Sequence, residues 1–388
     1  MMKICMATWE FPPRIVGGIA RHCNGLSKAM AHNGHEVHIV TLDFPGAPEF
    51  EEIDGVKVYR AATELGHPNF LTWALLFNHF MEKKIAGVSR KADFDVVHVH
   101  DWLTAFAGIS FKHQMEKPLV ATIHGTEAGR AQGLHNPDSF TIDGVEWWTT
   151  YEANKIIVTS GSMKAEIQGH FHPPPEKIEI IPNGIDPRKY NASVDRSAVR
   201  GRYGVSPHEK LVLCVGRLVP QKGIEYLIGA VPMIAQRCPE TKLIIVGEGW
   251  LRGHLERVAR STGHQWRITF TGWIPDHELT ALLNSADVLV VPSIYEPFGI
   301  VALEGMAAGV PVVASNLGGL AEIVEHDRTG ILAYSRNPDS IAWAIDRVLS
   351  DRGHSEWLVQ NAREMVQKTY SWEAIAMRTA EVYEEVVG

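Results

Sequence analysis

The sequence has few cysteines and no excess of basic residues. The four cysteines, Cys5, Cys23, Cys214 and Cys238, show no CxxC spacing, and each lies in an apolar or helical run. This pattern favours buried free thiols in a reducing compartment over disulfides or metal ligands. The net charge of −8 over 388 residues argues against nucleic acid or an anionic membrane as the main partner, because both bind basic surfaces. Any anion-binding site must therefore be local.

Long apolar runs are also missing. No run approaches the roughly 18 residues of a membrane span, and the chain opens on a strand-like segment rather than on a signal peptide. We therefore predict a cytoplasmic protein without a transmembrane segment. The most apolar helical pattern, residues 70–88, contains Lys83 and Lys84. It favours a core helix, and peripheral membrane contact remains the alternative.

What the sequence does have is a regular alternation of apolar strands with amphipathic helices, which is typical of parallel sheets covered on both faces. The first series of strands is expected at residues 3–8, 36–42, 56–59, 95–99, 119–123, 155–159 and 178–181. The second series is expected at residues 211–215, 243–246, 268–271, 288–291 and 312–314. Turn formers crowd the intervening segment 182–187. The pattern predicts an α/β protein of two doubly wound, Rossmann-like domains, 1–184 and 185–371.

In such sheets ligands bind at the carboxyl ends of strands, where helix N-termini favour anions. The first expected strand ends in a loop that carries Glu10 and the pair Gly17-Gly18 before a helix. Two glycines let a backbone approach phosphate closely, although a simple tight turn is an equal alternative. The loop lacks the GxGxxG spacing, which lowers the case for NAD.

The mirror position in the second domain is "VGRLVPQKG", where Arg217 and Lys222 follow a strand. Two cations five residues apart in an acidic protein favour a diphosphate site, with the arginine binding through its fork and the lysine as a point charge. A solvated loop pair is the alternative.

Two carboxylates, Glu296 and Glu304, lie in "EPFGIVALEG". Residues 300–308 are expected to form a helix, so Gly299, Ile300 and Val301 offer unpaired N–H groups at its start. Because carboxylates repel a diphosphate, we expect them to bind sugar or ribose hydroxyls. A paired-carboxylate glycosidase is the rival interpretation, and the cationic loop weakens it.

Two patterns invite a metal interpretation. In "HVHDW", His98 and His100 share one face of a strand, but no third ligand stands at a recognisable spacing, which favours packing or substrate contact. The triplet Asp93-Phe-Asp95 has the form DxD but precedes a strand instead of following one. We therefore expect no essential metal and no other cofactor.

Several motifs together resemble one family. "EPFGIVALEGMAAGVPVVAS" resembles the Glu-x7-Glu segment of retaining family 4 glycosyltransferases, and "VGRLVPQKG", "VGEG", "FTGWIPDHEL", "SADVLVVPS" and "IPNGID" are similar to its pattern in the same order. The resemblance implies a GT-B architecture, with a nucleotide sugar held mainly by the second domain, an acceptor by the first, and reaction in the cleft. It also implies that a C-terminal helix, residues 372–388, returns to the first domain.

The resemblance further implies residue roles. Arg217 and Lys222 would bind the donor diphosphate, helped by the backbone at Gly17 and Gly18, and His124 of "ATIHGTEAGR" would lie near the donor sugar. The other expected donor contacts are Glu296 for the sugar, Glu304 for the ribose, Ile274 at the nucleobase, and Phe298, Gly299, Ile300 and Val301 beside the diphosphate. The expected acceptor-side residues are Asp101, Trp102 and Glu10.

The segment "GLHNPDSFTIDGVEWW" resembles the glycogen-synthase-like branch, although Ile15-Val-Gly-Gly replaces the Lys-x-Gly-Gly of the bacterial glycogen and starch synthases. Arg14 stands one position from the missing lysine. The resemblance implies transfer of a glucosyl group from UDP- or ADP-glucose to a glycan. The alternatives are a small-sugar or lipid-linked acceptor, a mannosyl donor, and a nucleotide-sugar epimerase or hydrolase.

Overall fold

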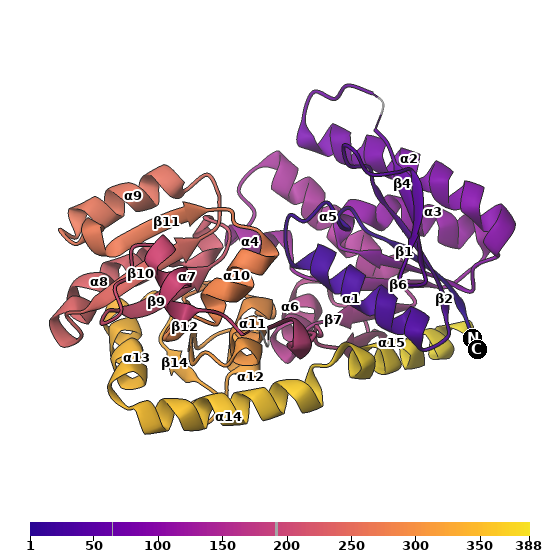
Figure 1. The fold of residues 1–388 in the computed structure, drawn as a ribbon. Coiled ribbons are helices and arrows are strands. Elements are labelled where there is room, and N and C mark those ends of the chain that lie inside the picture. Colours follow the sequence, from indigo (N-terminus) through magenta and orange to yellow (C-terminus); the bar gives the residue numbers. More distant parts are fainter. Residues whose placement is uncertain (64, 191–192) are drawn as a thin grey trace. The chain divides into compact units, whose positions relative to one another are not determined.

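The computed structural model describes residues 1–63, 65–190 and 193–388. Its internal contacts divide the chain into two compact units (Figure 1). Unit 1 comprises residues 1–184 together with 372–388, and unit 2 comprises residues 185–371. Each unit is built around one sheet.

The sheet of unit 1 is parallel except for one edge strand. Its order is β3-β4-β2-β1-β5-β6-β7-β8, and β3 alone pairs in the antiparallel direction, with β4. The strands β1, β2, β5, β6 and β7 are almost wholly buried, as expected for strands that helices cover on both faces. The strands are β1 Lys3–Ala7, β2 Glu36–Leu42, β3 Phe50–Ile53, β4 Val56–Ala61, β5 Val96–His100, β6 Leu119–Ile123, β7 Lys155–Val158 and β8 Ile178–Ile180.

Two hydrophobic clusters fill the two faces of this sheet. One involves β1, β2, β4, β5, α1 and α15, and the other involves β5 to β7 with α2, α3 and α6. Asparagine caps begin two of the helices: Asn69 accepts from Thr72 N, and Asn136 forms a capping box with Ser139. The helices are α1 Gly18–His32, α2 Phe70–Ala92, α3 Ala105–Met115, α4 Glu127–Ala131, α5 Pro137–Glu152, α6 Gly161–Phe171 and α15 Trp372–Val387.

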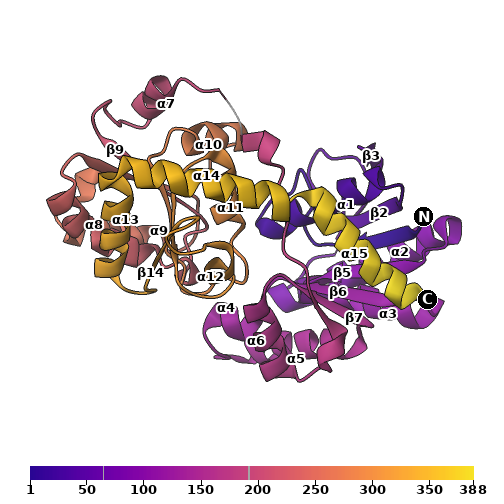
Figure 2. The same cartoon turned by 90° about the horizontal axis from the view of Figure 1, so that it is seen from below.

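The C-terminal helix α15 belongs to unit 1, where it lies beside α1 (Figure 2). The Trp372 ring sits so close to Gly25 and Gly184 that a Cβ at those positions would lie 2.1 and 2.6 Å from it. Tyr383, from the same helix, is fully buried. The last helix is therefore part of the core of the unit in which the chain begins.

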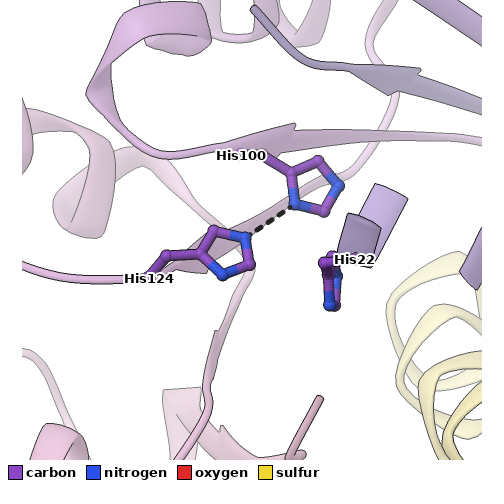
Figure 3. Close-up of side chains that lie close together, drawn as sticks. All are labelled: His22, His100 and His124. Carbon is purple, nitrogen blue, oxygen red and sulfur yellow. Dashed lines mark hydrogen bonds between the residues drawn. The ribbon is translucent and has the colours of Figure 1, made fainter. Parts of the chain in front are cut away.

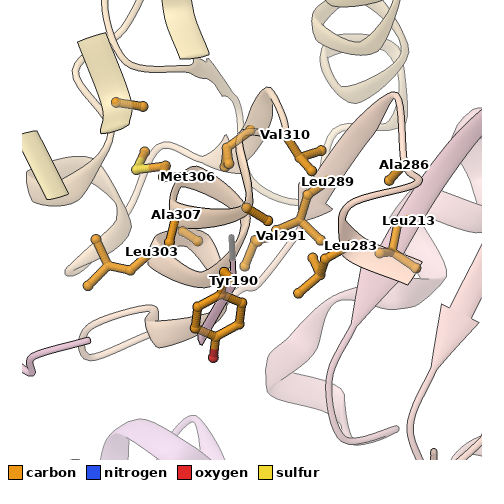
Figure 4. Close-up of a cluster of buried hydrophobic side chains, with 14 of the residues drawn as sticks. Tyr190, Leu213, Leu283, Ala286, Leu289, Val291, Leu303, Met306, Ala307 and Val310 are labelled. Carbon is orange, nitrogen blue, oxygen red and sulfur yellow. The ribbon is translucent and has the colours of Figure 1, made fainter. Parts of the chain in front are cut away.

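The sheet of unit 2 is entirely parallel, in the order β11-β10-β9-β12-β13-β14. One of its two cores packs α11 and α14 against β9, β12 and β13 (Figure 4). The strands are β9 Lys210–Val215, β10 Thr241–Val246, β11 Ile268–Gly272, β12 Val288–Val291, β13 Val312–Ser315 and β14 Ile331–Ala333. The helices are α7 Arg196–Arg202, α8 Ile224–Arg237, α9 Arg252–Ser261, α10 Asp276–Leu283, α11 Ile300–Ala308, α12 Leu320–Ile323, α13 Pro338–Ser350 and α14 Arg352–Thr369.

The predicted α/β class with two doubly wound parallel sheets is confirmed. The sequence did not indicate the short edge strands β3 and β14. Among the described residues no helix is long and apolar enough to cross a membrane, and α2 uses its apolar face to build the core of unit 1.

Each sheet has a topological switch point, where successive connections leave in opposite directions. It lies between β1 and β5 in unit 1 and between β9 and β12 in unit 2. Ligands of open α/β sheets bind outside the strand ends at such points. The two switch points are therefore the places in each sheet where a ligand is expected to bind.

Candidate functional site

At the switch point of unit 2, glycines bring three strand-end loops into backbone contact. Gly223 has φ +59°, and a Cβ there would lie 2.2 Å from the carbonyl oxygen of Pro292. Gly247 has φ +132°, and its Cβ would lie 2.0 Å from the carbonyl oxygen of Gly216. Both conformations and both close approaches require glycine. The loops after β9, β10 and β12 are thus held together without side chains between them.

The two predicted cations behave differently in this loop cluster. The side chain of Arg217 is exposed, and within the described residues its guanidinium makes no ion pair or hydrogen bond. The Lys222 ammonium is half-buried and lies 2.6 Å from Glu296 Oε2. Gln221, next to this lysine, accepts hydrogen bonds through its carbonyl oxygen from Ile294 N and Tyr295 N. The loop that carries Arg217 and Lys222 and the loop that carries Glu296 are therefore joined by hydrogen bonds.

Glu296 is held in place by several contacts besides Lys222. The Ser293 hydroxyl donates to its Oε2 at 3.1 Å, and its own carbonyl oxygen accepts from Gly319 N at 2.9 Å. A Cβ on Gly318 would lie 2.3 Å from that carbonyl oxygen. The carboxylate is thus preorganised beside a cation, at the strand end where the sequence predicted it.

The N-terminus of α11 follows immediately. Gly299 has φ +111°, and Leu320 packs against the space where its side chain would be. The first N–H groups of a helix have no partner within the helix, so Ile300 and Val301 present donors to an anion. The ring of Phe298 is buried in the core of unit 2. Only the backbone of this residue therefore faces the position predicted for the nucleotide sugar.

Glu304 and Ile274 occupy less open positions. Glu304 is 3% exposed and accepts a hydrogen bond from the Tyr190 hydroxyl at 2.8 Å. Ile274 follows β11 and packs partly buried against the core of unit 2. Their assigned contacts to ribose and nucleobase remain predictions.

In unit 1 the loop after β1 is held by the carboxylate of Glu10. Glu10 is 1% exposed, and its Oε2 accepts hydrogen bonds from Val16 N at 2.6 Å and Gly17 N at 2.9 Å. This carboxylate braces the loop that leads to Gly18, and its place on the acceptor side remains a prediction. The guanidinium of Arg14 donates to the carbonyl oxygen of Asp43.

Asp101 and Trp102 follow β5 and differ from each other. Asp101 has φ +56°, and its Oδ1 accepts from His124 N at 2.7 Å. Burial raises the pKa of Asp101 to about 6, and Arg130 opposes the shift. Trp102 instead packs in a small core with Ala74, Leu103 and Ile142. Both residues are buried, and their acceptor-side roles remain predictions.

Three histidines converge beside Asp101 (Figure 3). His124 Nε2 lies 3.2 Å from His100 Nδ1, and His22 of α1 packs edge-on against both rings. Burial lowers the pKa of His124 to about 3 and that of the other two well below the usual value. All three rings are therefore neutral at physiological pH. Sequence reasoning missed His22, because only its place on the buried face of α1 distinguishes it.

A hydrogen-bonded pair, the buried Glu146 and the half-buried Arg130, braces the loop after His124. Glu146 of α5 is 3% exposed and accepts from Glu127 N at 2.8 Å and from Arg130 at 2.7 Å, while Arg130 also donates to the carbonyl oxygen of Gly125. Burial raises the pKa of Glu146 to about 8 against the pull of Arg130. No local motif marked Glu146, which stands between tryptophan and valine on an apolar helix.

Two family models match the chain. Residues 16–189 match glycosyltransferase family 4, and residues 195–365 match glycosyl transferases group 1. An uncharacterized glycosyltransferase of Methanocaldococcus jannaschii is 48% identical over 98% of this chain and 98% of its own length. The chain belongs to glycosyltransferase family 4.

Further relatives agree with this family. A glycogen synthase of Mycobacterium tuberculosis is 38% identical to this glycosyltransferase over 98% of the chain and 94% of the relative. Among solved structures, a sucrose-phosphate synthase from Thermosynechococcus elongatus has a TM-score of 0.86 with 27% identity over 99% of both chains. An Anabaena protein crystallised with UDP-glucose has a TM-score of 0.80 at 22% identity, covering 99% of this chain and all of the other, and so supports the GT-B fold alone.

Proposed function

We propose that this glycosyltransferase moves a glucosyl group, with retention of configuration, from a nucleoside diphosphate glucose to an α-glucan. The observation that carries the donor half is the arrangement at the switch point of unit 2: an exposed Arg217, Lys222 beside Glu296, and the N-terminus of α11. The glycogen synthase that aligns with 98% of the chain supports the acceptor half.

The donor cations act on the leaving group. Breaking the anomeric C–O bond leaves positive charge on the sugar and negative charge on the departing diphosphate. Arg217, Lys222 and the N–H groups of α11 stabilise that negative charge where it develops, and preorganised donors of this kind are the most effective. Binding of the diphosphate replaces part of the contact between Lys222 and Glu296, which frees the Glu296 carboxylate for the hydroxyls of the donor sugar.

The remaining candidate residues have narrower roles. Glu304 binds the ribose, the loop at Ile274 borders the nucleobase, and the backbone of Gly17 and Gly18 assists the diphosphate. His124, held neutral, assists at the sugar, and Asp101 orients the acceptor. The acceptor oxygen bonds to the anomeric carbon on the face that the diphosphate leaves, and its proton passes to the diphosphate. No step requires a metal ion or another cofactor.

The test is release of nucleoside diphosphate from UDP-glucose, ADP-glucose and GDP-mannose, each with and without glycogen, in EDTA. We expect release from one glucose donor, stimulated by glycogen and unaffected by EDTA, together with lengthened glucan chains. Release that needs a divalent ion would overturn metal independence. Release without any acceptor product would instead indicate a hydrolase or an epimerase.

A small-sugar acceptor is the second candidate, and the sucrose-phosphate synthase neighbour at 27% identity favours it. It predicts that a small sugar or sugar phosphate, and not glycogen, stimulates release. A mannosyl donor with a lipid-linked acceptor predicts release from GDP-mannose only.

A further inference from the structure

The histidine cluster of unit 1 contains buried ring nitrogens that the transferase chemistry does not use. His22 and His100 are 3% and 0% exposed. Nε2 of each ring is buried and has no hydrogen-bond partner among the described residues. A buried polar atom without a partner is costly and rare in native structures, and a bound ion or water commonly explains it. The two atoms differ in position, because His100 meets His124 through its other ring nitrogen, Nδ1. A ligand held between the rings would therefore account for His22 Nε2 alone.

The separations within the cluster suit a metal ion. His22, His100 and His124 each offer one ring nitrogen, and these three atoms lie within 4.8 Å of one another. His100 Nδ1 and His124 Nε2 are already 3.2 Å apart. Two imidazole nitrogens bound tetrahedrally at about 2.0–2.1 Å from Zn²⁺ are about 3.4 Å apart, so this pair needs almost no movement. The His22 ring, which lies beside the other two (Figure 3), would have to move toward them to complete the site.

The surroundings orient His22 as they orient many metal ligands. Its Nδ1 lies 2.7 Å from Asn183 Oδ1, so the ring donates there and its Nε2 carries the lone pair. His98 is different, although it packs on His100. Both of its nitrogens are occupied, one by the Tyr383 hydroxyl at 2.6 Å and the other by the Thr122 hydroxyl at 2.7 Å. His98 is therefore committed to structure. In the other three rings, His22 Nε2 has no partner among the described residues, and His100 and His124 share one hydrogen bond that a bound ion would replace.

We propose that His22, His100 and His124 form a binding site for a divalent transition metal of the class that prefers imidazole ligands, such as Zn²⁺, Co²⁺ or Ni²⁺. No third ligand stands at a recognisable spacing along the chain, and α1 supplies it from 78 residues upstream of His100. The ion is not needed for transfer. Instead it occupies His124, so loading the site inhibits the enzyme; this inhibitory consequence rests on the proposed role of His124.

The direct test is a cobalt titration of the full-length protein after it has been stripped with EDTA. We expect about one Co²⁺ per chain with the intense visible absorption of a tetrahedral or five-coordinate site, and displacement by Zn²⁺. His22→Ala should abolish this band. Asn183→Ala, which removes the partner of a ligand, should lower cobalt affinity about 10- to 100-fold. His79→Ala, on the exposed face of α2, should change neither the band nor the affinity.

The outcomes separate the site from the reaction. An absent band, or an equal band in wild type and His22→Ala, overturns the site, provided that circular dichroism shows the variant folded. A band that only Asn183→Ala weakens also overturns the assignment of His22. Zinc inhibition that EDTA reverses in wild type supports the whole proposal. Tight cobalt binding without inhibition supports the site and counts against His124 in the proposed function.

Discussion

The two switch points occupy equivalent places in two similar sheets, yet different kinds of chemical groups line them. In unit 2 the loops are held by glycine backbones, and the functional groups are a partly exposed lysine, an exposed arginine and a helix N-terminus. In unit 1 the corresponding position is filled by buried imidazoles and carboxylates, with one arginine among them.

This difference in chemical groups implies that the two switch points have different functions. A cradle of N–H groups and solvated cations binds a highly charged anion at little desolvation cost and adapts to it. A buried, neutral and hydrogen-bonded polar cluster binds charge poorly, but it holds side chains in one orientation. We therefore expect changes in unit 2 to affect catalysis more than stability, and changes in unit 1 to affect both.

Lys222→Ala should have the largest effect on turnover. Losing a preorganised cation at the leaving group should lower kcat about 100- to 1,000-fold, because the charge on the diphosphate develops in the transition state. The melting temperature should change by no more than a few degrees. Steady-state kinetics and thermal unfolding of the same preparation measure both.

The control for this prediction is Lys368→Ala, which removes a lysine from an exposed ion pair with Glu364. It should alter neither quantity, because exposed pairs contribute about 0–1 kcal/mol. An equal fall of activity and stability in Lys222→Ala would show that the loop is structural.

Gly223→Ala should have the second-largest effect. The left-handed conformation costs a non-glycine residue about 1–2 kcal/mol, and the Cβ would also overlap the Pro292 carbonyl oxygen. The loop must then move away from β12, so we expect lower stability together with weaker binding of nucleoside diphosphate, measured by calorimetry.

Gly201→Ala is the matched control for the glycine change. Its Cβ meets nothing within 4 Å, and the residue lies in α7 with an ordinary backbone conformation. It should raise stability slightly, by up to about 1 kcal/mol. If Gly223→Ala behaves in the same way, the close approach of the loops is not required.

In unit 1, Tyr383→Phe should destabilise the fold by about 1 kcal/mol or more. The change removes one hydroxyl from α15 and leaves His98 Nδ1 buried without its partner. Chemical denaturation should show the loss, whereas Tyr151→Phe on the exposed face of α5 should show none. An unchanged midpoint for Tyr383→Phe would mean that water replaces the hydroxyl.

The smallest expected effect is a change in how stability depends on pH when Glu146 is replaced. Native Glu146 keeps its proton up to about pH 8, whereas the unfolded chain releases it near the ordinary value of 4.5, so wild type loses stability as pH rises through this window. Glu146→Gln does not titrate and should lack this loss. Its melting temperature relative to wild type should therefore rise between pH 5 and pH 8.

The control for the pH prediction is Glu240→Gln, an exposed carboxyl in unit 2. It should give the same difference from wild type at both pH values. A constant difference for Glu146→Gln would mean that Arg130 keeps the native carboxylate ionised.

Sequence patterns predicted the unit 2 site better than the unit 1 site. Arg217, Lys222 and Glu296 stand in loops directly after apolar strands, so strand positions and residue types were enough to bring them to one edge. Glu10 and Trp102 stand in similar positions, but their contacts run inward, to Gly17 N and to a small core. Neighbouring residues do not reveal whether a strand-end side chain faces solvent or braces the loop.

The sequence by itself determined the alternation of strands and helices, because burial on both faces of a parallel sheet requires continuous apolar runs with helices between them. It also determined the positions of the glycines and of Arg217 and Lys222 after their strand. The tertiary structure alone decided that His22 meets His100 and His124, that Glu146 pairs with Arg130, and that Tyr383 reaches His98. Those contacts join residues 16 to 285 positions apart, and packing of the helices onto the sheet, not spacing along the chain, brings them together.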